Sequence, residues 1–169
     1  TENYIYDDKN RLEHTITHNS MDGNLDKEFT YPSTGTLLNK NITGNPVKTR
    51  TKHNNRWIGT IEQVYDANGI QPKETRISNS DGSNARTDFS YVYDDKGNIR
   101  QLITADQVPT VYLWGYAGYY PVAEISNATY NQVRDALGGE TVVNSMCNEL
   151  KLSDANWNRL LALYAHTSL

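Results

Sequence analysis

Hydrophobic and polar residues alternate along much of the first 125 residues, which is the spacing of β-strands with one buried face. The clearest stretch is 88–93, where Phe89, Tyr91 and Tyr93 share one aromatic face. Short runs rich in Asn, Gly and Asp separate the alternating stretches. We therefore expect a mainly β protein, an antiparallel meander in a curved sheet, with strands at 3–6, 11–18, 26–31, 36–42, 47–53, 56–65, 73–79, 86–93, 99–104, 110–115 and 121–125.

The turn that follows Tyr93 has a distinct composition, Asp94-Asp95-Lys96-Gly97-Asn98. An Asp side chain can accept hydrogen bonds from its own backbone, and Gly adopts positive φ without steric cost. This chemistry predicts a β-hairpin in which Tyr93 and Ile99 face each other as a cross-strand pair.

The same turn recurs along the chain. In the copy at 6–12, Asn10 occupies the position of Gly97, and Asn tolerates positive φ better than most residues. Less regular copies lie at 31–37, 65–70 and 114–120. Their unequal intervals favour hairpins of unequal length over a strict solenoid. We assign structural roles in these turns to Tyr6, Asp7, Asn10, Tyr65, Asp66, Gly69, Tyr93, Asp94 and Gly97.

From Ser126 the hydrophobic spacing becomes helical. Thr129 and Gln132 form a capping box ahead of a helix that should end at Gly138. Further helices are expected at 142–150 and at 154–165, with Ser153 as a cap. The expected buried residues are Tyr130, Val133, Ala136, Leu137, Val143, Met146, Cys147, Leu150, Trp157, Leu160, Leu161 and Tyr164. We therefore expect a β region at 1–125 and a helical tail at 126–169 that packs on the sheet, together forming one structural unit.

Composition excludes several classes of partner. The net charge is −4, and the nearest thing to a basic cluster, Lys48, Arg50 and Lys52, alternates along a single expected strand. We therefore expect no binding to nucleic acid or to anionic membranes. The longest apolar stretch, 111–123, is too short to span a bilayer, which takes ~20 residues. Because the chain opens on mid-strand sequence, we expect it to be a segment of a longer protein.

The repeated Tyr-Asp-x-x-Gly/Asn-x-Leu/Ile turn resembles the YD repeat of the bacterial Rhs (rearrangement hot spot) family. The best matches are 91–99 and 4–12, and the stretch 112–125 is similar to a segment of large Rhs-type proteins that a short helical section follows. The resemblance implies antiparallel strands of a shell or scaffold in a secreted or cell-surface protein. The family's Asp-Pro-x-Gly processing element does not occur in this sequence, and the copies at 31–37 and 65–70 depart from the repeat.

The sequence contains no recognisable catalytic or metal-binding arrangement. His14 and His18 lie ~13 Å apart on one strand face, too far to share a metal. The carboxylate pairs at 7–8 and 94–95 belong to turns and lack the spacing of a calcium loop. Cys147 lies on the apolar face of an expected helix, which favours burial over reactivity. We therefore expect a non-enzymatic protein with no cofactor and no metal.

Aromatic residues between 112 and 120 offer the other candidate site. Trp114, Tyr116 and Tyr119 surround two glycines, and exposed rings of this kind can stack on sugars. A layer packed beneath the helices explains the same residues, with Tyr119 left in water. We therefore expect a structural module whose edge strands pair with neighbouring repeats. The alternative is a module that binds carbohydrate or another surface protein through these rings.

Overall fold

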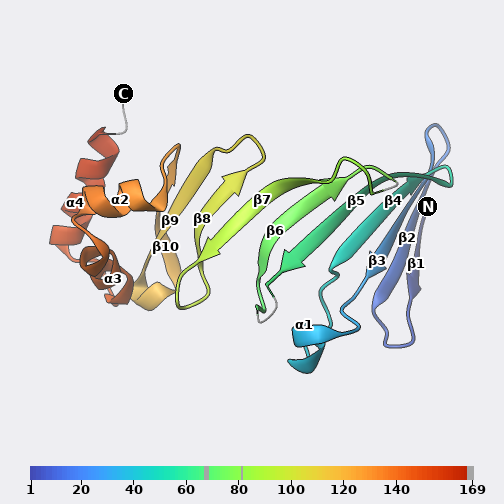
Figure 1. The fold of residues 1–169 in the computed structure, drawn as a ribbon, viewed down its shortest axis with the longest axis horizontal. Coiled ribbons are helices and arrows are strands. Elements are labelled where there is room, and N and C mark those ends of the chain that lie inside the picture. The colour runs from blue at the N-terminus through green and yellow to red at the C-terminus, as the bar shows by residue number, and fades with distance from the viewer. Residues whose placement is uncertain (67–68, 81, 167–169) are drawn as a thin grey trace. The chain divides into compact units, whose positions relative to one another are not determined.

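The computed structural model describes residues 1–66, 69–80 and 82–166 (Figure 1). Ten strands are hydrogen-bonded in sequence order within one sheet, which confirms the expected antiparallel meander. Ten of the eleven expected strands are present, with ends within three residues of those expected. The strands are β1 (Glu2–Tyr6), β2 (Leu12–Asn19), β3 (Gly23–Thr30), β4 (Lys48–His53), β5 (Arg56–Tyr65), β6 (Pro72–Ser78), β7 (Arg86–Tyr93), β8 (Ile99–Thr104), β9 (Pro109–Gly115) and β10 (Tyr120–Ser126).

The strand expected at 36–42 is wrong. The first part of this stretch belongs to a short helix, α1 (Gly35–Asn39). The first residue of this helix, Gly35, has a φ of 79°. One helical turn buries Leu37, which is 8% exposed, and leaves the adjacent Leu38 37% exposed. The copy of the repeated turn expected at 31–37 is therefore also wrong, because this segment leads into a helix and does not close a hairpin.

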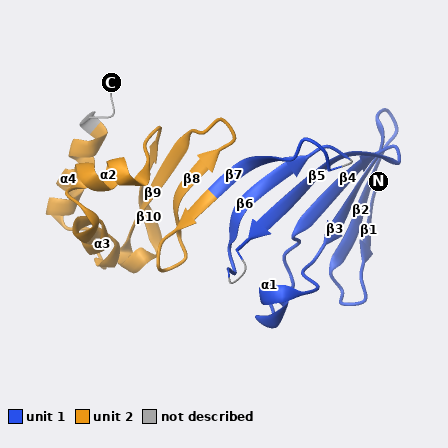
Figure 2. Cartoon of the chain, in the orientation of Figure 1, with its two compact units in different colours: residues 1–90 blue, residues 91–169 orange. Residues whose placement is uncertain are grey.

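The chain divides into two compact units, residues 1–90 and 91–169, which Figure 2 shows in blue and orange. The division falls within β7, whereas the sequence suggested a change of character at Ser126. The change from strand to helix does occur there, since β10 ends at Ser126 and the next helix begins at Tyr130.

Unit 1 has little conventional core. The buried residues among those described in this unit are Pro32, Leu37, Thr60 and Thr75. A row of side chains instead links four neighbouring strands, from β2 to β5. The Asp26 carboxylate lies 3.1 Å from His14 Nδ1 and 3.8 Å from Lys52 Nζ, and this ammonium sits 4.2 Å from the centre of the Trp57 ring. Such cross-strand pairs stabilise a sheet without a second layer.

Unit 2 contains a hydrophobic core between its strands and three helices: α2 (Tyr130–Leu137), α3 (Glu140–Asn148) and α4 (Asp154–His166). Val111 and Leu113 of β9 face these helices and are at most 2% exposed. The expected capping box is confirmed: the Thr129 amide donates to Gln132 Oε1 at 2.8 Å, and the Gln132 amide donates to Thr129 Oγ1 at 3.4 Å. Gly138 ends α2 with φ of 105°.

The helices use partly different faces from those expected. Leu150 lies beyond α3 and is 83% exposed, and Ala136 is also exposed. On α4, burial was expected for four residues and is wrong for three of them. Leu160 is buried, but 42–79% of the surface remains exposed for Trp157, Leu161 and Tyr164. The helix packs instead through Asn156, Leu160 and Leu163, a spacing of four and then three residues.

Candidate functional site

The turn between β7 and β8 is built around one carboxylate. Asp94 Oδ1 accepts the backbone amides of Lys96 at 2.9 Å and Asn98 at 2.8 Å. The Asp94 amide donates to the Asn98 carbonyl at 2.9 Å, and the Gly97 amide donates to the Asp94 carbonyl at 3.0 Å. Gly97 has φ of 87°, the left-handed conformation that a three-residue hairpin loop requires.

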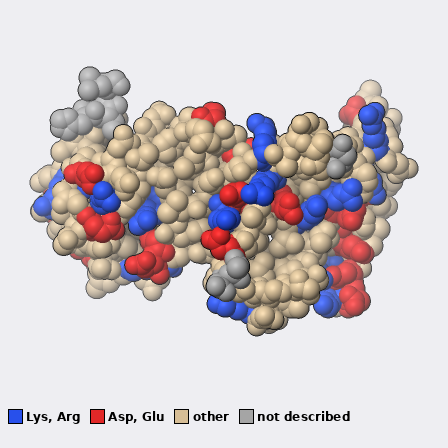
Figure 3. Space-filling view, in the orientation of Figure 1, with Lys and Arg blue, Asp and Glu red and all other residues tan. Residues whose placement is uncertain are grey.

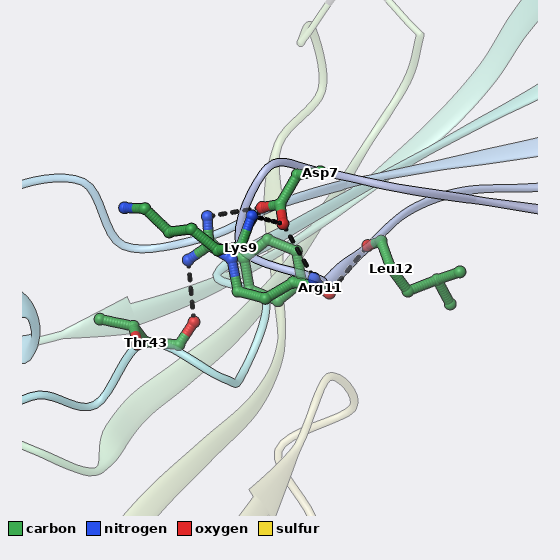
Figure 4. A network of polar contacts seen from close by, with 6 residues as sticks. Asp7, Lys9, Arg11, Leu12 and Thr43 are labelled. Atoms are coloured by element: carbon green, nitrogen blue, oxygen red, sulfur yellow. Dashed lines mark hydrogen bonds and ion pairs between the residues drawn. The ribbon is translucent and has the colours of Figure 1, made fainter.

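The turn between β1 and β2 repeats these bonds atom for atom (Figure 4). Asp7 Oδ1 accepts the amides of Lys9 at 2.9 Å and Arg11 at 2.8 Å. The Asp7 amide donates to the Arg11 carbonyl at 2.8 Å, and the Asn10 amide donates to the Asp7 carbonyl at 3.0 Å. Asn10 has φ of 58°, so it replaces glycine in the left-handed position as expected. Tyr6, which precedes the turn, pairs with Leu12 across the strands.

The remaining copies do not share this geometry. At 65–70 the Gly69 amide donates to the Asp66 carbonyl at 2.9 Å, but Gly69 is not left-handed and Tyr65 pairs with Pro72 across a longer loop. Residues 67 and 68 of this copy lie outside the described residues. At 114–120 the connection is a 3-10 turn, η1 (Tyr116–Gly118), with three successive positive φ angles. Sequence similarity in these copies therefore does not produce the same loop.

Two further hairpins have the backbone geometry without the carboxylate. The Asn79 amide donates to the Ser83 carbonyl, and the Thr104 amide donates to the Val108 carbonyl. Their left-handed residues are Gly82 and Gln107. A residue in this conformation recurs in all four loops, and among the described residues an Asp that accepts two backbone amides is seen in the turns at 7–11 and 94–98.

Each of these two turns also holds an irregular segment later in the chain. Arg11 Nη1 donates to the Thr43 carbonyl at 3.1 Å, as Figure 4 shows. The Arg11 guanidinium also lies 4.3 Å from the centre of the Tyr31 ring, and the Tyr31 hydroxyl donates to the Leu12 carbonyl. Arg11 in turn forms an ion pair of 2.7 Å with Asp7. The first turn therefore anchors the loop that follows α1.

The second turn holds η1 and the end of α3. Lys96 Nζ donates to the Ala117 carbonyl at 2.8 Å and to Asn148 Oδ1 at 2.9 Å. Asn98 Nδ2 donates to the Gly118 carbonyl at 3.0 Å. A Cβ on Gly118 would lie 2.7 Å from the Lys96 side chain, so glycine at this position allows the close approach.

The three aromatic residues proposed as ligand contacts have separate environments. The Trp114 indole donates to the Ile99 carbonyl at 2.8 Å and is half-buried. Tyr116 packs edge-on against Tyr120, with ring centres 5.9 Å apart. Tyr119 is 78% exposed, as expected. The residues of β9 in the core beneath the helices are Val111 and Leu113, whereas Trp114 and Tyr116 are half-buried and lie outside this core cluster.

A charged cluster in unit 2 has no counterpart among the expected site residues. The Arg100 guanidinium lies 4.1 Å from the centre of the Tyr130 ring, and Arg100 Nη1 lies 4.0 Å from Glu140 Oε1. The Tyr130 hydroxyl donates to the same Glu140 oxygen at 2.9 Å. Burial and this bond to a carboxylate raise the pKa of Tyr130 to about 12.

Two of the histidines contact neighbouring polar side chains, and the cysteine is partly buried. His14 contacts Asp26, and His18 Nδ1 lies 2.9 Å from Asn24 Oδ1. Cys147 is a half-buried free thiol. Within the described ranges, no group of three or more His, Cys, Asp or Glu side chains is placed to hold a metal ion. On the face drawn in Figure 3, basic and acidic residues are intermixed.

The chain matches no protein-family model, and no curated protein is significantly similar to it. The resemblance to YD repeats therefore remains a prediction that depends on the turn motif. None of the helices in the described part of the chain is long and apolar enough to cross a membrane.

Proposed function

We propose that this chain is a non-catalytic structural module of a large secreted or cell-surface YD-repeat scaffold. The two Asp-centred turns, the strands that follow one another without crossover and the resemblance of the motif support this proposal. The secreted or surface location rests on the resemblance alone. In this function the module's partners are neighbouring repeats that extend the sheet.

The observation that carries the proposal is the exposed edge of the sheet at β1. Every residue of β1 is exposed, and Tyr4, Ile5 and Tyr6 retain 55%, 44% and 58% of their accessible surface. Exposed apolar edge strands promote pairing with further strands. Since β1 carries neither Lys nor Pro, which often protect such edges, it is suited to accept a neighbouring strand.

The outward backbone groups of β1 can be assigned from its register. Thr1 and His18 exchange hydrogen bonds in both directions, at 2.8 and 3.2 Å. Because antiparallel pairing alternates, Asn3, which lies opposite Ile16, also bonds inward to β2. The amide and carbonyl of Tyr4 therefore point away from β2 and are the groups that a neighbouring strand would bond.

Hydrogen exchange of single amides tests the proposal. In this chain alone, the Tyr4 amide should exchange quickly and the Asn3 amide slowly. In the longer parent protein, the Tyr4 amide should become at least 100-fold slower, while Asn3 serves as an internal control that is protected in both. If the Tyr4 amide exchanges as fast in the parent as in this chain, no neighbouring repeat pairs with β1 and the scaffold proposal fails.

The second candidate function is a module that binds carbohydrate or a surface protein through the aromatic residues of 112–120. One observation favours carbohydrate as the ligand: Trp114 lines a cavity in unit 2. Tyr116 and Tyr119 do not line this cavity.

A further inference from the structure

An apolar groove of about 410 Å³ runs between β10 and α4 in unit 2. β10 is the last strand of the sheet, and in the described part of the chain its strand partner is β9 (Figure 1). Five consecutive residues of β10, 122–126, line the groove. Because consecutive side chains of a strand point to opposite faces, these five residues share only the backbone edge of the strand. The groove therefore opens on the edge at which a further strand would pair.

The other wall of the groove is an exposed apolar stripe of α4. It consists of Trp157, Leu161 and Tyr164, which are 42%, 62% and 79% exposed. Their intervals of four and three residues place them on one face of the helix. A contiguous apolar surface of this kind marks an interaction site, whereas single exposed apolar side chains do not.

The outward backbone groups of β10 follow from its register. The Asn127 amide donates to the Pro109 carbonyl at 2.8 Å. Because antiparallel bonds alternate, Ile125, two residues earlier, also bonds β9. The amides and carbonyls of Glu124 and Ser126 therefore point away from β9, in the direction of a further strand.

The two faces of β10 indicate which side chains that strand carries. Ala123 and Ile125 face the helices and pack against the core, while the exposed Glu124 carboxylate lies on the other face. A residue that pairs with Glu124 lies on the same face as this carboxylate, and opposite charges stabilise such a cross-strand pair. The residues on either side of it point into the groove, toward α4. This geometry favours a Lys or Arg between two large apolar residues.

We propose that the groove binds a strand from a neighbouring repeat of the scaffold, with the pattern apolar–basic–apolar. The backbone of this strand bonds Glu124 and Ser126, and its two apolar side chains pack on the stripe of α4. The inference rests on the proposed scaffold function and adds the chemistry of the partner at β10. It also explains why the three residues of the stripe, which the sequence predicts to be buried, are exposed in this chain.

Titration of the isotope-labelled chain with short peptides, followed by chemical shifts, tests this chemistry. The probe is the acetylated and amidated peptide Ser-Thr-Ile-Lys-Phe-Thr-Ser, which should shift the Ser126 amide and the Trp157 indole with a millimolar or tighter Kd. The control peptide Ser-Ile-Thr-Lys-Thr-Phe-Ser has the same composition but places Ile, Lys and Phe on one face, so it should bind at least tenfold more weakly. Methylation of the probe's Lys backbone nitrogen removes its bond to the Glu124 carbonyl and should abolish binding.

Matched variants locate the site. Leu161→Asn removes one residue of the apolar stripe and should weaken binding at least tenfold. Leu150→Asn makes the same change at an exposed residue outside the groove and should leave the Kd unchanged. Replacement of the probe's Lys by Glu should weaken binding at least threefold, and Glu124→Gln should remove this difference. Unshifted amides elsewhere in unit 2 confirm that each variant is folded.

Hydrogen exchange in the longer parent protein tests the source of the strand. There the Ser126 amide should exchange at least 100-fold more slowly than in this chain, compared at a concentration at which ultracentrifugation shows this chain to be monomeric. The proposal is overturned if the probe does not bind, if it binds no better than the control peptide, or if its methylated form binds equally well. It is also overturned if Leu161→Asn binds as the wild type does, or if Glu124→Gln keeps the preference for Lys.

Two further results would show a different occupant. If the Ser126 amide exchanges as fast in the parent as in this chain, no neighbouring repeat lies in the groove. If this chain self-associates and the Ser126 amide becomes protected, the occupant is a second copy; either result overturns the proposal. The Tyr4 amide of β1 reports on the scaffold function separately, so protection of Tyr4 without protection of Ser126 refutes this inference and leaves the scaffold function standing.

Discussion

Replacing Asp94 with Ala should weaken unit 2 more than its position in a surface turn suggests. The carboxylate accepts two backbone amides, one from half-buried Asn98 and one from exposed Lys96. A bond to a charged acceptor contributes ~1.5–3 kcal/mol when shielded and less when exposed to water. We therefore expect a loss of about 2 kcal/mol in the free energy of unfolding, or roughly 8–16 °C in the Tm of a unit of this size.

Two neighbouring substitutions are the controls. Asp94→Asn keeps an oxygen that can accept both amides but removes the charge, so about half of the loss should remain, ~1 kcal/mol. Asp95→Ala removes the same side chain one residue later. Because Asp95 is exposed, the expected change is within ~0.5 kcal/mol.

Unfolding has to be measured for unit 2 by itself. In a Trp57→Phe background the remaining tryptophans, Trp114 and Trp157, both belong to unit 2, so urea unfolding followed by fluorescence reports on that unit. Hydrogen exchange of the Lys96 and Asn98 amides gives a local measurement. If Asp94→Ala costs no more than Asp95→Ala and leaves these amides as slow as in the wild type, the carboxylate does not hold the turn.

Three further predictions follow from single residues of unit 2. Gly97→Ala forces a side chain into φ of 87° and should cost ~1–2 kcal/mol in urea unfolding, whereas Gly44→Ala, at an open position without positive φ, should not destabilise. Thr129→Ala removes the acceptor of the capping box and should cost ~1 kcal/mol by thermal unfolding. The pKa of Tyr130 is raised from 10.0 to about 12, so its contribution to stability is complete below pH 10 and is lost as pH rises through 12. In Glu140→Gln this pKa should fall, which carbon-13 NMR of the tyrosine rings measures directly; an unchanged pKa would contradict the role of Glu140.

The strands were predictable because the turns that separate them are local. The bonds that close the Asp94 loop on itself join residues within five positions, so composition alone indicates the loop and, with it, the two strands. The helix at 130–137 was predictable for the same reason, since its capping box and its terminal glycine are contiguous in sequence.

The failures involve contacts with distant residues. The stretch at 36–42 is apolar enough for a strand, but burial of Leu37 and the left-handed Gly35 favour a helical turn. On α4 the sequence offers two apolar stripes, and the partner surface selects the one that includes the polar Asn156. This residue could not be assigned to the core from its type, because its burial depends on a 2.7 Å bond from its amide to Glu149.

For a related reason, the repeat pattern did not predict that the Asp-centred turns also bond segments distant in sequence. Both turns donate to backbone carbonyls of irregular segments, Thr43 in one case and Ala117 and Gly118 in the other. Such carbonyls lack strand partners and have to be satisfied by other donors. Both turns use a donor four residues after the Asp, Arg11 in the first and Asn98 in the second, and the second turn adds Lys96, two residues after the Asp. The Asp is therefore the constant part that shapes the loop, and the variable positions beside it determine which later segment each loop holds.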